Sequence, residues 1–327
     1  MTPEMRTKVD VSIIIVNWNS VDFLRECLAS IVAKTHDISY EVIVIDNASY
    51  DGSQEMLRKE FPQVLYIQSN ENLGFSKANN IAFERSAGSA LLFLNPDTLV
   101  LNSAVRLMFK HLNSSAAIGA VGAGVLNSDQ SLQTHYVQAF PTILNQMLVS
   151  ESAKRWFPKA KMWGIRQVLE YAGHPVEVEM VMGSCVMIKR DVFEKVGGFD
   201  EDYFMYAEDV ALCYAIRKSG HRIDYVREAA VIHHGGKSSD FKEESQFSIV
   251  MPRESMVIFF TKTKGKAYAI LFKWATAISA FGRLLLLTGA VPFKRTLLGK
   301  KRLAMVAKKW KTVLRWSLGL ETLSVTK

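Results

Sequence analysis

The sequence has 327 residues, of which 49% are hydrophobic; this is enough for one large α/β domain or two ordinary domains and excludes a disordered chain, a collagen and a coiled coil. Its three cysteines, Cys27, Cys185 and Cys213, include no Cys-x-x-Cys pair, which excludes a disulfide framework and indicates a reducing compartment. The net charge of +8 divides unevenly, because residues 1–250 carry 24 basic and 30 acidic side chains (−6), whereas residues 251–327 carry 16 and 2 (+14).

Four short apolar runs in the first 125 residues predict strands buried on both faces: Val11–Val16, Glu41–Ile45, Val64–Gln68 and Ala90–Leu94. Apolar residues at three-and-four spacing between them predict helices over residues 21–33, 52–59 and 75–87. This alternation implies right-handed crossovers, so we expect an α/β fold with a doubly wound, mostly parallel sheet. The first apolar run is too short for a signal peptide, and we expect the body to stay in the cytosol.

Polar loops follow three of these strands, at residues 17–20, 46–49 and 95–98. Ligands of doubly wound sheets bind beyond the carboxyl ends of the strands. Any one of these loops could consist of ordinary turn and capping residues, but three at one edge favour a ligand site. A dinucleotide-binding fingerprint and a P-loop are both absent from the sequence.

Residues 126–179 show no clear period, and we assign no element there. Beyond them, the pattern predicts a strand over 178–189 that is interrupted at Gly183-Ser184, a helix over 208–219, and two strands over 222–226 and 230–233. This second half of the body is therefore less regular than the first.

Asp97 follows a buried strand, where a carboxylate needs a partner such as a metal ion to offset its desolvation. His233 and His234 end a later strand and point to opposite faces, so at most one can join a site. A histidine at a strand end is more often a surface residue; if one is functional, we favour His233 as a metal ligand beside Asp97. Lys237, in the loop that follows, would supply a counter-charge for phosphate.

Glu208 and Asp209 are adjacent carboxylates at the start of a predicted helix, whose dipole favours their ionised form. Such pairs are common in helices without a function. Here the pair follows a loop, residues 198–206, that would present the helix start, so one carboxylate could act as a general base.

Seven segments in this order resemble the family 2 glycosyltransferases, specifically their bacterial rhamnosyltransferase-like branch: VSIIIVNWNS, EVIVIDNASYDGS, ENLGFSKANN, LFLNPDT, MGSCVMIKR, GGFDEDYFMYAEDVALC and VIHHGGKSS. The resemblance covers about 70% of the chain, from Val11 to Ser239. It implies a GT-A fold, a nucleotide-sugar donor, a divalent metal (Mg²⁺ or Mn²⁺) and inversion at the anomeric carbon. The Gln-x-x-Arg-Trp motif of processive synthases does not occur, so we expect transfer of a single sugar.

The resemblance also assigns the donor site. The nucleoside pocket would be lined by Asn17, Asn19, Asp46 and Asn47, and the segment that closes around the nucleotide and sugar would contribute Gly74, Phe75 and Asn79.

The remaining assignments concern the metal and the acceptor. Asn95-Pro96-Asp97 stands where many members have Asp-x-Asp, so metal binding would rely on Asp97 and His233, and Asn95 would contact the nucleotide sugar. Asp209 would be the base and Glu208 an acceptor contact, with Gly183 and Ser184 in the acceptor wall.

The basic extension has an amphipathic pattern. Lys262, Lys266 and Lys273 fall within about 40° on a helical wheel, and another side gathers Ile270, Trp274, Ile278, Phe281 and Leu285. This pattern is typical of a helix on an anionic membrane surface. Lys273 and Arg283 interrupt the apolar stretch, so we expect no membrane-crossing helix. The alternatives are packing on the body or on a second copy, as in a homo-oligomer; we expect no nucleic-acid binding, because the acidic body offers no extended basic face.

We therefore expect a GT-A domain over residues 1–250, with a nucleotide-sugar part to about 125 and an acceptor part from 126, followed by a membrane-associating extension over 251–327. The protein would sit peripherally on the cytoplasmic face of the bacterial inner membrane. On the resemblance, it would transfer L-rhamnose from dTDP-rhamnose to a saccharide on polyprenyl diphosphate, in O-antigen, capsule or cell-wall synthesis.

Three alternatives remain open. The donor could be a UDP- or GDP-sugar. A nucleotidyltransferase would need a Gly-rich loop after the first strand, which Asn17-Trp18-Asn19 does not provide. A catalytically silent scaffold is hard to reconcile with intact Asp46, Asp97 and Asp209.

Overall fold

The computed structural model describes residues 9–133, 135–148, 175–235, 245–290 and 297–321, except for the side chains of Leu148 and of residues 288–302. The chain divides into two compact units: residues 1–140, 157–204 and 208–239 form the first, and residues 141–156, 205–207 and 240–327 form the second. The domain boundary expected after residue 250 falls inside helix α10 (Gln246–Lys264).

Among the described residues of the first unit, nine strands form one sheet in the order β3-β2-β1-β4-β10-β6-β11-β5, with β8 paired to β11. The half of this sheet that contains β1 (Val11–Asn17), β2 (Tyr40–Asp46), β3 (Leu65–Gln68) and β4 (Ala90–Leu94) is parallel. β10 (Cys185–Lys189) then runs antiparallel to both of its neighbours, β4 and β6. The predicted doubly wound α/β fold is confirmed, as a mixed sheet.

Most predicted strands lie within one or two residues of the observed ones. One exception is the pair of strands predicted over 222–226 and 230–233, which form a single strand, β11 (Arg222–His233), with a register shift opposite β6. Another is β3, an edge strand rather than a strand buried on both faces, in which Leu65 is exposed. The strand predicted over 178–189 is divided between β9 (Met180–Val181), which pairs with β7 (Val137–Gln138), and β10 in the main sheet.

Sequence reasoning did not predict β6 (Ile118–Leu126), although it is almost wholly buried. Its glycines weaken the strand signal, but they are required by packing. A Cβ at Gly122 would lie 2.6 Å from Cγ1 of Val181, and one at Gly124 would lie 2.2 Å from the carbonyl oxygen of Arg227. The short strands β5 (Thr98–Val100) and β8 (Val176–Val178) were not predicted either.

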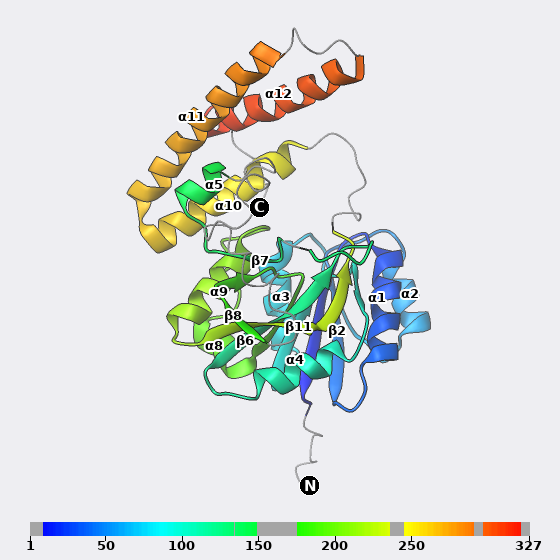
Figure 1. Ribbon diagram of the computed structural model, residues 1–327. Helices are drawn as coiled ribbons and strands as arrows, with labels where there is room; N and C mark the ends of the chain where they lie inside the picture. The colour runs from blue at the N-terminus through cyan, green and yellow to red at the C-terminus, as the bar shows by residue number, and fades with distance from the viewer. Residues whose placement is uncertain (1–8, 134, 149–174, 236–244, 291–296, 322–327) are drawn as a thin grey trace, which may run out of the picture. The chain divides into compact units, whose positions relative to one another are not determined.

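Helices of the first unit cover both faces of the sheet; in Figure 1, α3 lies behind it and α4 in front. α1 buries Leu24, Cys27, Leu28 and Ile31, in agreement with their three-and-four spacing. α3 ends three residues before the predicted end. The helices of this unit are α1 (Val21–Lys34), α2 (Ser53–Glu60), α3 (Gly74–Glu84), α4 (Ala104–Leu112), α8 (Arg190–Val196) and α9 (Glu208–Lys218).

The second unit is helical and contains α5 (Ile143–Leu148), α10, α11 (Lys266–Ala290) and α12 (Leu297–Ser317). Phe260 of α10 packs against the rings of Tyr268 and Phe272 of α11, with centroids 5.1 and 5.0 Å apart. Gly265, at φ +90°, separates α10 from α11. Lys262 and Lys266 therefore belong to different helices, and the single amphipathic helix assumed by the helical wheel is wrong.

One face of α11 is apolar and exposed. It contains the five residues that the wheel grouped together, Ile270, Trp274, Ile278, Phe281 and Leu285, and also Leu271 and Leu286. The segment Lys266–Leu287 is long and apolar enough to cross a membrane, which the positions of Lys273 and Arg283 led us not to expect. Length and composition alone are weak evidence for a membrane span.

Candidate active site

The carboxyl ends of β1 and β2 bring Asn17 and Asp46 together. Asn17 Nδ2 donates to Asp46 Oδ2 at 2.7 Å and to Ser53 Oγ at 3.0 Å. Asp46 Oδ1 accepts from the Ser49 amide at 2.7 Å and from Gln68 Nε2 at 3.2 Å. Both Asn17 and Asp46 are buried. Because these bonds occupy the Asn17 amide, Asn17 is placed to orient Asp46 rather than to face a ligand.

Asn47 connects this edge of the sheet to the start of α3. Its Nδ2 donates to the Gly74 carbonyl at 3.0 Å, while its buried Oδ1 has no hydrogen-bond partner among the described residues. The Phe75 amide in turn donates to the Phe204 carbonyl at 2.8 Å. Asn79, expected to close around the nucleotide, is buried and donates to the Phe75 carbonyl of its own helix at 2.9 Å.

Two aromatic side chains at this edge are exposed, Trp18 by 53% and Tyr50 by 89%, and sequence reasoning did not assign them to the site. Asn19, at φ +48°, accepts the Tyr50 amide at 3.0 Å and so joins the two loops. A cavity of about 490 Å³ also opens in this unit, lined by residues that include Gln68 and Lys77. Aromatic faces and a cavity beside Asp46 are features that a nucleoside can use.

Asp97 and His233 face one another at the end of β4 and β11. His233 Nε2 lies 3.4 Å from Asp97 Oδ1 and 3.4 Å from Asn95 Nδ2, and Asp97 is buried. On the other side of the ring, His233 Nδ1 lies 3.0 Å from Gln133 Oε1. An amide oxygen only accepts, so Nδ1 donates its proton to Gln133, and Nε2 is the ring nitrogen that faces the Asp97 carboxylate.

Gln133 lies in the segment to which we assigned no element, and no sequence signal pointed to it. His234 points elsewhere: its Nδ1 lies 2.9 Å from Ser128 Oγ, and its ring packs against Phe23. Both histidines lie beside Asp97, because the His234 amide donates to the Asp97 carbonyl at 3.0 Å, but only the His233 side chain faces the Asp97 carboxylate. Lys237 lies outside the described residues.

The start of α9 places Glu208 and Asp209 beside the Gly183-Ser184 turn. Asp209 Oδ2 accepts from the Gly183 amide at 2.9 Å, and Oδ1 accepts from the Val210 amide at 2.8 Å. Burial raises the pKa of Asp209, and these amides act in the opposite direction. Burial, followed by the neighbouring Asp209 charge, raises the pKa of Glu208 strongly, and Glu208 Oε2 has no hydrogen-bond partner among the described residues.

A backbone hydrogen bond links the loop of Asp97 to the turn beside Asp209. The Asn95 amide donates to the Ser184 carbonyl at 3.0 Å. The Ser184 hydroxyl itself is buried, without a partner in the described part of the chain. One edge of the sheet thus carries an oriented carboxylate, an Asp–His pair and the Asn17–Asp46 cluster. This combination can bind a charged ligand and remove a proton from a hydroxyl group beside it.

Known proteins resemble this chain in sequence and in structure. The chain is 28% identical over 239 residues to N-acetylglucosaminyl-diphospho-decaprenol L-rhamnosyltransferase of Mycobacterium tuberculosis (strain CDC 1551 / Oshkosh), covering 69% of this chain and 76% of that protein. It is 28% identical over 238 residues to rhamnosyltransferase WbbL of Escherichia coli (strain K12), covering 68% and 83%. The solved mannosyltransferase PcManGT from Pyrobaculum calidifontis, in complex with GDP-Man and Mn²⁺, aligns with a TM-score of 0.54 at 20% identity, covering 98% of this chain and 87% of that one.

The structural likeness supports the GT-A fold expected from the sequence. Residues 12–197, more than half of the chain, match the family model of glycosyl transferase family 2. The chain therefore belongs to glycosyl transferase family 2 and is a glycosyltransferase.

Proposed function

We propose that this glycosyltransferase moves a single L-rhamnose from dTDP-rhamnose to a saccharide carried on polyprenyl diphosphate, with inversion at the anomeric carbon. The observation that carries the proposal is the carboxylate of Asp209, held by the Gly183 amide on the same hydrogen-bonded edge as Asp97 and His233. Both relatives are named as rhamnosyltransferases, which supports rhamnose as the transferred sugar. The name of the mycobacterial relative also includes a diphospho-decaprenol, which supports a lipid-diphosphate acceptor.

Asp209 would act as the general base. Two backbone amides hold both of its oxygens, which fixes the direction of the carboxylate, and its partial burial raises the pKa and makes the ionised group a stronger base. As the acceptor hydroxyl attacks from the face opposite the leaving nucleotide, Asp209 takes its proton. Glu208, whose raised pKa favours the protonated form, would donate a hydrogen bond to the acceptor.

The Asp97–His233 pair fits a divalent cation. Oδ1 of Asp97 and Nε2 of His233 face each other at 3.4 Å, and a carboxylate oxygen and an imidazole nitrogen are both ligands that divalent cations accept. Within the described segments, no group of three His, Cys, Asp or Glu side chains could hold a metal, so diphosphate oxygens would complete the ligand set. A bound Mg²⁺ or Mn²⁺ supplies positive charge for the departing nucleoside diphosphate.

The donor nucleoside would occupy the edge of β1 and β2. Asp46 is held there by Asn17 and Gln68, and the exposed rings of Trp18 and Tyr50 offer stacking faces. Asn47 and the start of α3 would lie beside the diphosphate of the donor. The Asn47 side chain donates a hydrogen bond to the Gly74 carbonyl, which holds these two parts of the chain together.

We also propose that the protein attaches to the cytoplasmic face of the membrane through the exposed apolar face of α11. Ile278 and Leu286 on this face are 71% and 76% exposed. Basic residues accompany it in the same unit, and together they suit an anionic lipid surface. Such attachment would bring the enzyme to an acceptor that resides in the membrane.

The test is transfer by the purified protein to a polyprenyl-diphosphate-linked saccharide, with dTDP-rhamnose, UDP-glucose and GDP-mannose supplied separately, each with Mn²⁺ and with a chelator. We expect rhamnosylated product of inverted configuration from dTDP-rhamnose alone, and none with the chelator. Transfer from UDP-glucose or GDP-mannose instead would replace the assigned donor, and retained configuration would exclude the mechanism.

A further inference from the structure

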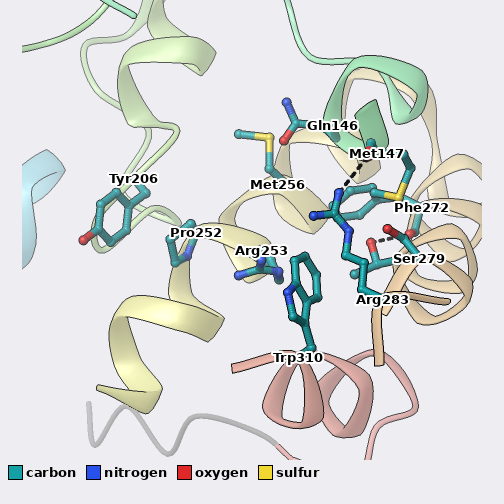
Figure 2. A pocket seen from close by; sticks show the side chains of 11 residues that line it. Gln146, Met147, Tyr206, Pro252, Arg253, Met256, Phe272, Ser279, Arg283 and Trp310 are labelled. Carbon is teal, nitrogen blue, oxygen red and sulfur yellow. Dashed lines mark hydrogen bonds between the residues drawn. The ribbon is translucent and has the colours of Figure 1, made fainter. Parts of the chain in front are cut away.

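The second unit contains a partly open cavity of about 270 Å³ to which the proposed reaction assigns no role. Three helices contribute to it: Arg253 comes from α10, Arg283 from α11 and Trp310 from α12. Figure 2 shows these three side chains converging on the cavity. The cavity therefore depends on the packing of all three helices.

The charged side chains of the lining are all positive. Two arginines line the cavity, and none of its lining residues is acidic. The Arg283 guanidinium lies 4.4 Å from the centre of the Trp310 ring and donates to the Met147 carbonyl at 3.3 Å. Among the described residues Arg283 forms no salt bridge, although it is partly buried. A charge withdrawn from water in this way gains from an anionic partner.

The rest of the lining combines apolar side chains, among them Met147, Met256 and Phe272, with the uncharged polar side chains of Gln146, Thr276 and Ser279. Charged guanidinium groups beside apolar walls suit an amphiphile whose anionic head continues into a hydrocarbon chain. The volume lies slightly below the range for ligand pockets, roughly 300–1,000 Å³. It suits a head group with its first carbons rather than a complete lipid-linked saccharide.

The cavity is connected through the chain to the proposed base. Tyr206 lines the cavity and precedes Asp209 by three positions in the sequence. Tyr206 and Ala207 have φ of +70° and +63°, and the Met205 carbonyl accepts from Ser255 Oγ of α10 at 2.9 Å. The segment that leads to the base is thus anchored to a helix of the cavity.

We propose that this cavity binds the phosphate head of the acceptor's lipid carrier, with Arg253 and Arg283 on the phosphate oxygens and Met256, Phe272 and Trp310 on the adjoining carbons. The identity of the ligand as the acceptor's carrier rests on the proposed function. Its chemical class, a phosphate ester of a long-chain alcohol, rests on the cavity alone.

The experiment is calorimetric titration of the full-length protein with farnesyl diphosphate, inorganic diphosphate and farnesol. We expect farnesyl diphosphate to bind more tightly than either part of it. Arg283→Gln should weaken that binding by at least about tenfold, because charge-assisted hydrogen bonds are among the strongest polar contacts. Arg283→Lys should recover part of the loss. Equal affinities of the wild type and Arg283→Gln would overturn the proposal.

Lys273→Gln is the matched control. It removes one positive charge from the same helix, and Lys273 also lies over a tryptophan ring, 5.3 Å from the centre of Trp316, but it does not line the cavity. We expect its affinity for farnesyl diphosphate to equal that of the wild type. An equal loss in both variants would assign the effect to net charge and reject the site. If thermal unfolding shows that Arg283→Gln does not fold, Arg253→Gln carries the same test.

Two further outcomes separate the possible ligands and the two proposals. Displacement of farnesyl diphosphate by short-chain phosphatidylglycerol at equal concentration would assign the cavity to a membrane phospholipid and overturn the carrier assignment. Transfer activity without binding of farnesyl diphosphate would reject the cavity assignment alone. Tight binding without transfer from any donor would reject the proposed function while supporting the cavity's chemical class.

Discussion

The amide of Gly183 donates to Oδ2 of Asp209 at 2.9 Å, across 26 residues of sequence. The contact is close, because a Cβ at position 183 would lie 3.3 Å from the Cβ of Asp209. The turn before β10 therefore fixes the carboxylate at the start of α9.

Asp209→Asn should lower kcat for sugar transfer by at least about 100-fold, because an amide cannot accept the proton and general bases contribute 10²–10⁴-fold. The KM for the nucleotide sugar should change little. Asp202→Asn, in the exposed loop before the same helix, is the control and should retain the wild-type rate. A rate near that of the wild type in Asp209→Asn would remove the assigned base.

Glu208→Gln should change the pH dependence of stability. Because burial raises the folded-state pKa of Glu208, its stabilising contribution is complete below the ordinary glutamate pKa of about 4.3 and is lost as the pH rises through the raised value. The variant cannot ionise, so its free energy of unfolding should fall less than that of the wild type over this range. Urea unfolding at a series of pH values measures the difference; parallel curves would contradict the assignment.

Gln133→Leu should weaken metal activation, because it removes the acceptor that sets the tautomer of His233. Loss of such an outer partner typically costs about 10–100-fold in metal affinity. The measurement is the Mn²⁺ concentration for half-maximal transfer. Gln138→Leu, whose native side chain donates to the His135 carbonyl instead, should leave that concentration unchanged. An unchanged value in Gln133→Leu would show that His233 needs no such orientation.

Gly74→Ala should destabilise the first unit more than Gly52→Ala does. Both glycines have positive φ, +78° and +86°, and share the backbone penalty of about 1–2 kcal/mol for an L-residue. Only at position 74 would the new Cβ also meet an atom, the Phe204 carbonyl oxygen at 2.4 Å; at position 52 nothing lies within 4 Å. The difference between the two variants in free energy of unfolding, measured by chemical denaturation, gives the cost of the contact with the Phe204 carbonyl. Equal losses of stability in both variants would show that this contact costs nothing.

Replacement of Ile278 and Leu286 by Gln should reduce binding to phosphatidylglycerol vesicles by at least about tenfold, because each large apolar side chain contributes about 1.5–3 kcal/mol when fully buried. The control replaces Val32 and Leu65, two exposed apolar residues of the first unit, and should bind like the wild type. Co-sedimentation with vesicles gives the comparison. Equal binding of both double variants would exclude the α11 face as the attachment surface.

The sequence by itself determined the elements of the parallel half of the sheet, because burial and helical periodicity are local properties of β1, α1, β2 and β4. It also placed Asp97 after a strand and Asp209 at a helix start, since those positions follow from element boundaries. The predictions failed where local signals were weak or misleading. The glycines of β6 weakened the sequence signal of a buried strand. Gly265 separates two helices, whereas the apolar pattern predicted one continuous helix.

Only the tertiary structure decided which side chains meet. Gln133 reaches His233 across 100 residues of sequence, Gly183 reaches Asp209 through the turn before β10, and Arg253, Arg283 and Trp310 share a cavity because three helices pack together. Such contacts depend on strand order and helix packing, which are set by burial of the whole core rather than by the period of any one segment.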